Sequence, residues 1–179
     1  DSGSTKTDWR LVNDKDILSF STIGFNPYHI SNSQVLKELH SSDLADFSSL
    51  ISKVFFYGAG CSSIDKNEFI SEALSLFFKN AEIEVHHDLL AAARAYCGNL
   101  PGMTAILGTG SNSCLYDGEI IVENIPALGY VLGDDGSGVD FGKMLLKKLF
   151  TKELSDELSL RFKEEYSLNL NDILNAVYK

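Results

Sequence analysis

The chain has 179 residues, of which 44% are hydrophobic and 22% are charged, a composition typical of a globular protein. Twenty-five acidic residues against fifteen basic ones give a formal net charge of −10. This argues against nucleic-acid binding, which usually needs a basic surface. The longest stretch without charge, residues 95–116, contains Asn99, Pro101 and four glycines, so it is not expected to be a membrane helix.

Three cysteines, Cys61, Cys97 and Cys114, show no spacing typical of disulfides, zinc or iron–sulfur clusters. They are interpreted as reduced thiols of a cytoplasmic protein. The chain has no initiator Met and no signal peptide, and it opens on Asp1 inside a polar loop. We therefore expect a fragment that is truncated at both ends.

The first hundred residues alternate between strand and helix patterns, which predicts an α/β arrangement. The predicted strands are residues 8–13, 16–23, 53–57 and 82–87. The predicted helices are residues 33–52, as one broken helix or two short ones, residues 67–79, and the alanine-rich residues 89–97.

The pattern changes after residue 98, because ten of the fourteen glycines lie between Gly98 and Gly142. Three short strands are predicted at residues 103–107, 113–116 and 119–123, with a hairpin turn at Asp117-Gly118. Helices are predicted at residues 138–150, 153–166 and 170–178. We interpret this part as the beginning of a second domain.

A polar loop, Asp-Ser-Gly-Ser-Thr-Lys-Thr-Asp, occupies residues 1–8. Its glycine permits a tight turn, and its hydroxyls and successive amides can surround a phosphate. Asp1 offers a carboxylate to a divalent cation. A polar hairpin turn is the alternative, and the nucleotide P-loop spacing is absent. The candidate phosphate-binding residues are Gly3, Ser4, Thr5, Lys6 and Thr7.

A second glycine-rich loop spans residues 108–113, between two predicted strands. Its two glycines allow close approach of the main chain to a ligand, and its hydroxyls and amide offer hydrogen bonds. A glycine-rich hairpin without ligand is the alternative. The candidate phosphate-binding residues are Gly108, Thr109, Gly110 and Ser111.

Two further sites carry carboxylates. The segment Gly133–Gly138 opens a helix, and its Asp134-Asp135 pair could complement the helix N-terminus, accept hydrogen bonds from sugar hydroxyls or bind a metal. Asp88 follows a predicted strand, either as the N-cap of the next helix or as a carboxylate projecting into a cleft. His86 and His87 precede it without ligand partners at metal-binding spacing, so we do not expect them to bind metal.

Taken in order, these loops resemble those of the N-acetylglucosamine kinase branch of the BadF/BadG/BcrA/BcrD ATPase family, in the actin–hexokinase–Hsp70 superfamily. The match comprises residues 1–8, 58–61, 88–95, 108–113 and 129–138, and it covers most of residues 1–150. The resemblance implies an α/β fold with a ribonuclease-H-like (actin-like ATPase) domain at residues 1–100, lacking its first strand. It also implies an incomplete second such domain at residues 101–179, with ATP and substrate in the cleft between the domains.

The resemblance also implies roles for single residues. Asp88 would be the general base for the acceptor hydroxyl, Asp1 would hold Mg²⁺, and the two glycine loops would be the phosphate motifs. The sugar-binding positions would be Asn26, Thr109, Asn112 and Asp134. The match is looser around Asn26, because Tyr28 stands where the animal enzymes have an asparagine.

The implied activity is phosphorylation of an amino sugar, N-acetylglucosamine at its 6-hydroxyl, by a cytoplasmic enzyme that uses ATP and Mg²⁺. Neither nucleic acid nor a membrane is an expected partner, and a homodimer is left open. An electron-transfer ATPase and a sugar-binding regulator without catalysis are the alternatives. The family's adenosine-binding loop would lie beyond Lys179, so we expect this chain alone to lack a complete ATP site.

Overall fold

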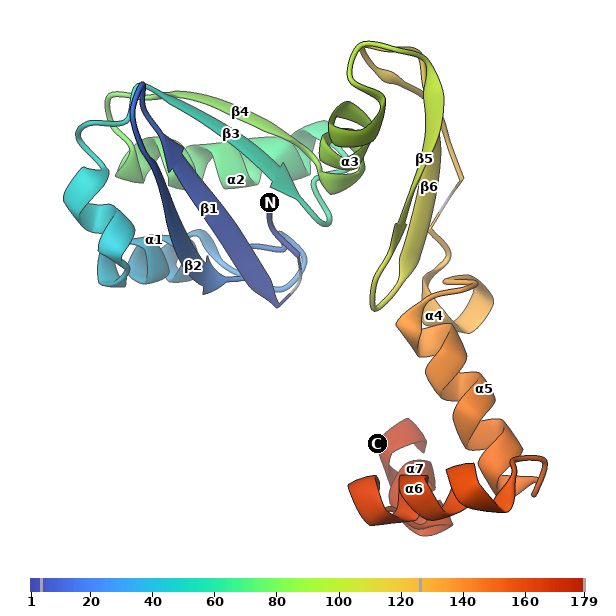
Figure 1. Ribbon diagram of the computed structural model, residues 1–179. Helices are drawn as coiled ribbons and strands as arrows, with labels where there is room; N and C mark the ends of the chain where they lie inside the picture. Colours follow the sequence, from blue (N-terminus) through green and yellow to red (C-terminus); the bar gives the residue numbers. More distant parts are fainter. Residues whose placement is uncertain (4, 126, 179) are drawn as a thin grey trace. The chain divides into compact units, whose positions relative to one another are not determined.

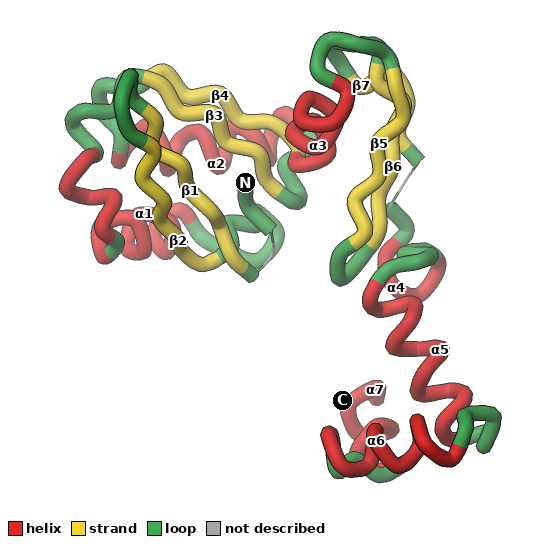
Figure 2. Tube along the Cα trace, viewed as in Figure 1, coloured by secondary structure: helices red, strands yellow, loops and turns green. Residues whose placement is uncertain are grey.

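The computed structural model describes residues 1–3, 5–125 and 127–178 (Figure 1). The chain forms two compact units. Unit 1 comprises Asp1–Ala105 and Ser113–Asn124, and unit 2 comprises Ile106–Asn112 and Ile125–Lys179. Helices and strands are both present, which confirms the predicted mixed α/β class (Figure 2). The division into two ribonuclease-H-like domains after residue 100 stays a prediction.

Unit 1 contains two pairs of strands. Strands β1 (Lys6–Val12) and β2 (Ile17–Ile23) form an antiparallel hairpin. Strands β3 (Lys53–Gly58) and β4 (Glu82–His87) are parallel, with Gly58 opposite His87. Ser2 joins the pairs, because it forms an antiparallel bridge to Thr7 and a parallel bridge to Gly58. The phosphate-loop candidate therefore begins at the ends of both strand pairs.

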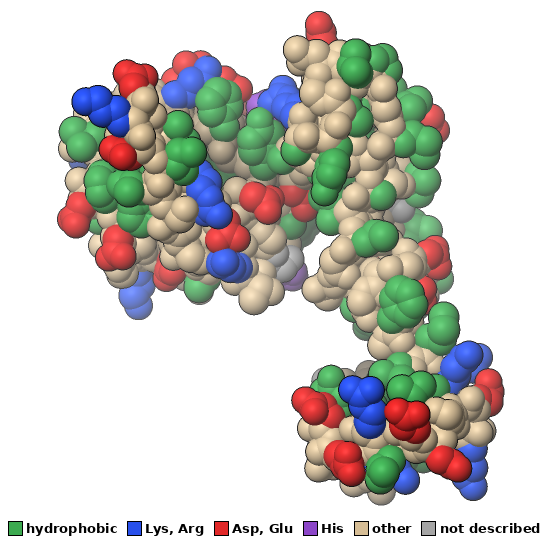
Figure 3. Space-filling view, viewed as in Figure 1, with side chains coloured by type: hydrophobic (Ala, Val, Ile, Leu, Met, Phe, Trp, Pro, Cys, Tyr) green, Lys and Arg blue, Asp and Glu red, His purple; other side chains and the backbone are tan. Residues whose placement is uncertain are grey.

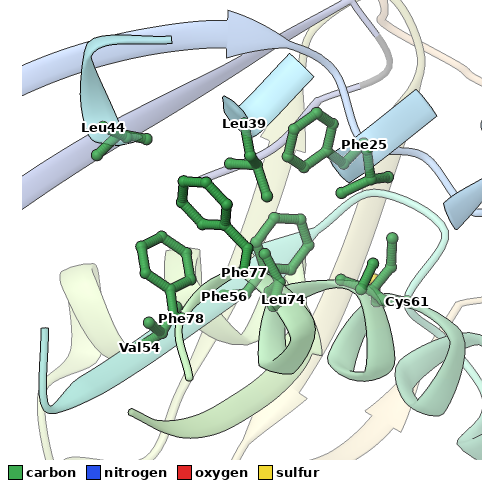
Figure 4. Close-up of a cluster of buried hydrophobic side chains, with 12 residues drawn as sticks. Phe25, Leu39, Leu44, Val54, Phe56, Cys61, Leu74, Phe77 and Phe78 are labelled. Carbon is green, nitrogen blue, oxygen red and sulfur yellow. The ribbon is translucent and has the colours of Figure 1, made fainter. Parts of the chain in front are cut away.

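Helices α1 (Asn32–Ser41) and α2 (Ile64–Phe77), with the 3-10 helix η1 (Asp43–Phe47), cover one face of these strands (Figure 1). Their apolar sides meet the inward residues of β3 in a single cluster (Figure 4). The ring of Trp9 lies 6.0–6.1 Å from the rings of Phe25, Phe56 and Phe78. Burial of apolar surface by these large rings stabilises unit 1.

Helix α3 (Asp88–Cys97) follows β4 directly and leads to a three-stranded sheet in the order β5 (Gly102–Leu107), β6 (Ser111–Tyr116) and β7 (Ile121–Asn124). The predicted hairpin turn at Asp117-Gly118 is confirmed, but it is longer than these two residues, because the connection between β6 and β7 comprises residues 117–120. The reason is that the Asp117 carboxylate accepts the amides of Glu119 and Ile120, both at 2.8 Å, which extends the turn.

Unit 2 contains the helices α4 (Gly129–Leu132), α5 (Gly138–Phe150), α6 (Asp156–Tyr166) and α7 (Leu170–Tyr178). The short helix α4 was not expected from the sequence. Helix α2 begins three residues before its predicted start, and β6 begins at Ser111, so the second half of the 108–113 loop lies in a strand.

No helix of the described residues is both long and apolar enough to cross a bilayer. On the face of the described chain shown in Figure 3, Lys and Arg side chains are scattered among acidic ones and do not gather into a patch.

Candidate functional site

The loop of residues 1–8 is fixed in unit 1 by Ser2, whose side chain is completely buried. The Ser2 amide donates to the carbonyl of Tyr57 at 2.8 Å, and the Ala59 amide donates to the Ser2 carbonyl at 2.7 Å. The Ser2 hydroxyl accepts from the amide of Phe25 at 2.9 Å and lies 2.8 Å from the Thr7 hydroxyl. Ser2 therefore joins three loops that are far apart in the sequence.

The main chain turns tightly after Ser2, with the Gly3 amide donating to the carbonyl of Lys6 at 2.9 Å. A side chain at Gly3 would meet only that carbonyl, at 3.7 Å, and the backbone there is not left-handed. Neither packing nor conformation thus requires a glycine at this position. The open space next to the Gly3 main chain is what a phosphate would need.

The other candidates of this loop differ in accessibility. Ser4 lies outside the described residues. Thr5 is exposed, and Lys6 forms a 2.8 Å ion pair with Asp8 on the surface. Thr7 is buried, and its hydroxyl donates to the carbonyl of Ile23 at 2.9 Å, so its side chain serves the fold.

Asp88 lies at the carboxyl end of β4, beside the end of β3, and its side chain is 23% exposed. Its interpretation as an N-cap is wrong, because the cap is His87, whose ring accepts the amide of Leu89 at 3.1 Å. Asp88 is instead the first residue of α3. Burial, together with the nearby Asp88 carboxylate, raises the pKa of the Cys61 thiol from its ordinary value of 9.0 to about 11.

Asn26, which follows β2 in the sequence, packs against the loop after β3 and is only 9% exposed. Gly60 has a φ of +83°, and a side chain there would come within 2.7 Å of the Asn26 Oδ1 atom. Glycine is thus required for both the turn and the approach of Asn26. The same Oδ1 atom accepts the amide of Tyr28 at 3.0 Å.

Unit 1 therefore brings together the loop of residues 1–8, Asn26, the Gly58–Cys61 turn and Asp88, at the carboxyl end of parallel strands. Ligands of open α/β sheets bind at this edge. Near this edge is a cavity of about 450 Å³ whose lining includes Cys61, His87 and Leu89 but not Asp88. Sequence reasoning missed the roles of Ser2 and His87. Ser2 acts through bonds to residues that are distant in the sequence, and histidine is not among the residues preferred at an N-cap.

In unit 2, residues 108–112 of the second glycine-rich loop lie against the first turn of α5. The Gly108 amide donates to the carbonyl of Gly110 at 2.9 Å. The first amides of the helix, those of Gly138 and Val139, donate to the carbonyls of Gly108 and Thr109 at 2.8 and 3.1 Å. The free amides of a helix N-terminus are thus used to fix this loop.

Asp134 is also part of this loop structure. Its backbone is left-handed, with a φ of 63°, and its Oδ1 atom accepts the amide of Ser111 at 2.9 Å. A side chain at Gly110 would lie 2.7 Å from that oxygen. Of the alternatives for Asp134, capping of α5 does not hold, since Ser137 is the N-cap. A non-glycine residue held in this conformation is often found at a functional site.

The sugar-binding candidates are thus divided between the units: Asn26 lies in unit 1, and Thr109, Asn112 and Asp134 lie in unit 2. No group of three or more His, Cys, Asp or Glu side chains among the described residues is arranged to hold a metal ion. Asp1 is an exposed residue at the start of its loop.

The chain matches no protein-family model and no curated protein. It is similar to the crystal structure of a protein assigned as an N-acetylglucosamine kinase from Porphyromonas gingivalis, with 42% identity, a TM-score of 0.92 and coverage of 99% of this chain. A protein of the same assignment from Chromobacterium violaceum, at 15% identity and a TM-score of 0.65 over 97% of this chain, supports the fold alone. The chain spans 64% and 65% of these two proteins, and within that part it is similar along almost its whole length.

Proposed function

We propose that this chain is part of an ATP-dependent kinase that phosphorylates an amino sugar, with N-acetylglucosamine as substrate and its 6-hydroxyl as acceptor. The observation that carries this proposal is the grouping of the 1–8 loop, Asn26 and Asp88 at one edge of unit 1. The 42% identity to a protein assigned as an N-acetylglucosamine kinase supports it. The ribonuclease-H-like fold and the membership of the BadF/BadG/BcrA/BcrD family are part of the same proposal.

Asp88 would act as the general base. The acceptor hydroxyl oxygen forms a bond to the transferred phosphorus, the bond from that phosphorus to its bridging oxygen breaks, and the hydroxyl proton goes to Asp88. The carboxylate suits this role because it projects from the end of a strand and is only partly exposed. Burial and the Asp88 carboxylate raise the pKa of the neighbouring Cys61 thiol to about 11, so this thiol is neutral near pH 7 and does not accept the proton.

The glycine loops would approach the phosphates with their main chain, at the open positions Gly3 and Gly108. Asn26 in unit 1 and Thr109, Asn112 and Asp134 in unit 2 would hold the sugar. Mg²⁺ commonly binds through one or two carboxylates and the substrate phosphates, and the single exposed carboxylate of Asp1 fits this mode. The ion would neutralise charge on the phosphate oxygens.

The test is an ADP-release assay of the whole protein with N-acetylglucosamine, glucosamine and N-acetylmuramic acid. Asp88→Asn should lower the rate by about 10²–10⁴-fold, the usual size of general-base catalysis, with sugar affinity nearly unchanged. Asp65→Asn is the matched control, because Asp65 is also an acidic residue in the first turn of a helix. Equal rates for both variants would mean that Asp88 is not the general base and only stabilises the start of its helix.

A further inference from the structure

Tyr28 and Lys66 form a pair close to Asn26 that the proposed function does not use. The ammonium group of Lys66 lies 4.5 Å from the centroid of the Tyr28 ring, which is within the range of a cation–π contact. Tyr28 follows Asn26 by two positions in the sequence and is 60% exposed. Lys66 lies in the first turn of α2 and is partly buried. The pair therefore places a positive charge near a sugar-binding candidate.

The turn after β2 fixes the position of the Tyr28 ring. The carbonyl of Asn26 accepts the amide of His29 at 2.9 Å, and the Oδ1 atom of Asn26 accepts the amide of Tyr28 at 3.0 Å. Pro27 restricts the backbone within this turn. A side chain at Gly60 would come within 2.7 Å of Asn26 and 3.1 Å of Tyr28. Both side chains therefore lie against Gly60, and the ring that holds the ammonium group belongs to the same loop as Asn26.

The ammonium group of Lys66 has no carboxylate partner among the described residues, whose ion pairs involve other side chains. Helical side chains meet at a spacing of three or four positions, and no acidic residue of α2 has this spacing from Lys66. The acidic residues of α2 are Asp65, Glu68 and Glu72. A chain of net charge −10 repels anionic ligands in general, so an anionic group can bind only beside a local cation such as this one.

We propose that Lys66 is a specificity-determining residue that pairs with a carboxylate on the amino sugar, so that the substrate class includes acidic amino sugars. This inference rests on the proposed function, in which Asn26 holds the sugar. The pairing is ionic and forms no covalent bond. A lysine has a flexible stem and can reach substituents of different lengths, while the contact with Tyr28 keeps its charge near the sugar.

The probes are N-acetylglucosamine and N-acetylmuramic acid, because the second differs from the first by a carboxylate-bearing ether group. The wild-type whole protein should phosphorylate both. Lys66→Met should lower kcat/KM for the acidic sugar by about tenfold, mainly through KM, and change that for the neutral sugar by less than about twofold. Lys66→Arg keeps the charge and should stay within about threefold of wild type for both sugars. Lys37→Met is the matched control, because Lys37 is an exposed lysine of helix α1.

A second measurement is independent of activity. In calorimetry of the whole protein, affinity for N-acetylmuramic acid should decrease as salt is raised from about 0.05 to 0.5 M, because salt screens a partly exposed ion pair. Affinity for N-acetylglucosamine should not change. Equal losses for both sugars in Lys66→Met, or a wild-type protein that phosphorylates only the neutral sugar, would overturn the proposal. Failure of the wild-type protein to phosphorylate any amino sugar would instead refute the proposed function.

Discussion

Substituting Gly110 with alanine should displace the carboxylate of Asp134. The added Cβ would lie 2.7 Å from Oδ1, and ordinary contact begins near 3.4 Å, so the oxygen must retreat by about 0.7 Å. Retreat along the bond would lengthen the Ser111 amide contact from 2.9 Å to about 3.6 Å, beyond hydrogen-bond range. The backbone at Gly110 is not left-handed, so alanine adds no conformational strain there.

The lost bond to a charged, partly exposed acceptor should cost about 1–2 kcal/mol. Alanine also restricts the unfolded chain more than glycine does, which stabilises the fold by roughly 0.4–1 kcal/mol. The net decrease in the free energy of unfolding is therefore about 1 kcal/mol. The matched control is Gly108→Ala, whose Cβ would meet only the Gly110 carbonyl at 4.0 Å. That variant should be as stable as wild type or slightly more stable.

Urea unfolding followed by circular dichroism measures this difference, and hydrogen exchange of the Ser111 amide locates it. In the whole protein, calorimetry should show about tenfold weaker sugar binding for Gly110→Ala, whereas Gly108→Ala should weaken ATP binding more than sugar binding. If both variants unfold at the same urea concentration and protect Ser111 equally, the carboxylate does not depend on the glycine and the reasoning fails.

Two further predictions concern unit 1. Ser2→Ala leaves the buried Phe25 amide without its acceptor and should cost about 1–3 kcal/mol in urea unfolding, while Ser19→Ala on the exposed part of β2 should have little effect. Cys61 should react slowly with iodoacetamide between pH 7 and 9, because its pKa is about 11. Since that pKa is higher in the folded chain, stability should decrease as the pH rises from about 9 to 11. Rapid alkylation at pH 8, or stability that is constant over the upper range, would contradict the shielding of this thiol.

Strand β4 shows what periodicity can predict. Its alternating pattern over residues 82–87 predicted both ends correctly, because Ile83 and Val85, two residues apart, pack against the core. The start of α2 was placed too late. Ile64 is apolar but exposed, and Asp65 is charged, so neither belongs to the buried stripe of the helix. The amphipathic pattern therefore misses the first turn.

The site loops were located from the sequence, but their internal contacts were not. Asp134 looked like a residue of a helix start, and its actual partner is the Ser111 amide, which is distant in the sequence. Asp88 looked like a cap because carboxylates often have that role, although the neighbouring His87 ring occupies it. The first contact depends on tertiary approach, which local propensity does not describe. The second is local, but a histidine stands where Ser, Thr, Asp or Asn is the usual N-cap.

The burial of Ser2 between two strand pairs has a consequence for how the molecule folds. The β1–β2 hairpin and the β3–β4 unit can each form from contacts of their own, but the bonds of Ser2 to Tyr57 and Ala59 close a long stretch of chain. Closure of a long loop is entropically costly and slow. The phosphate-loop candidate is therefore expected to reach its final conformation only after both strand pairs have docked, so a partly folded chain would not yet have this part of the site.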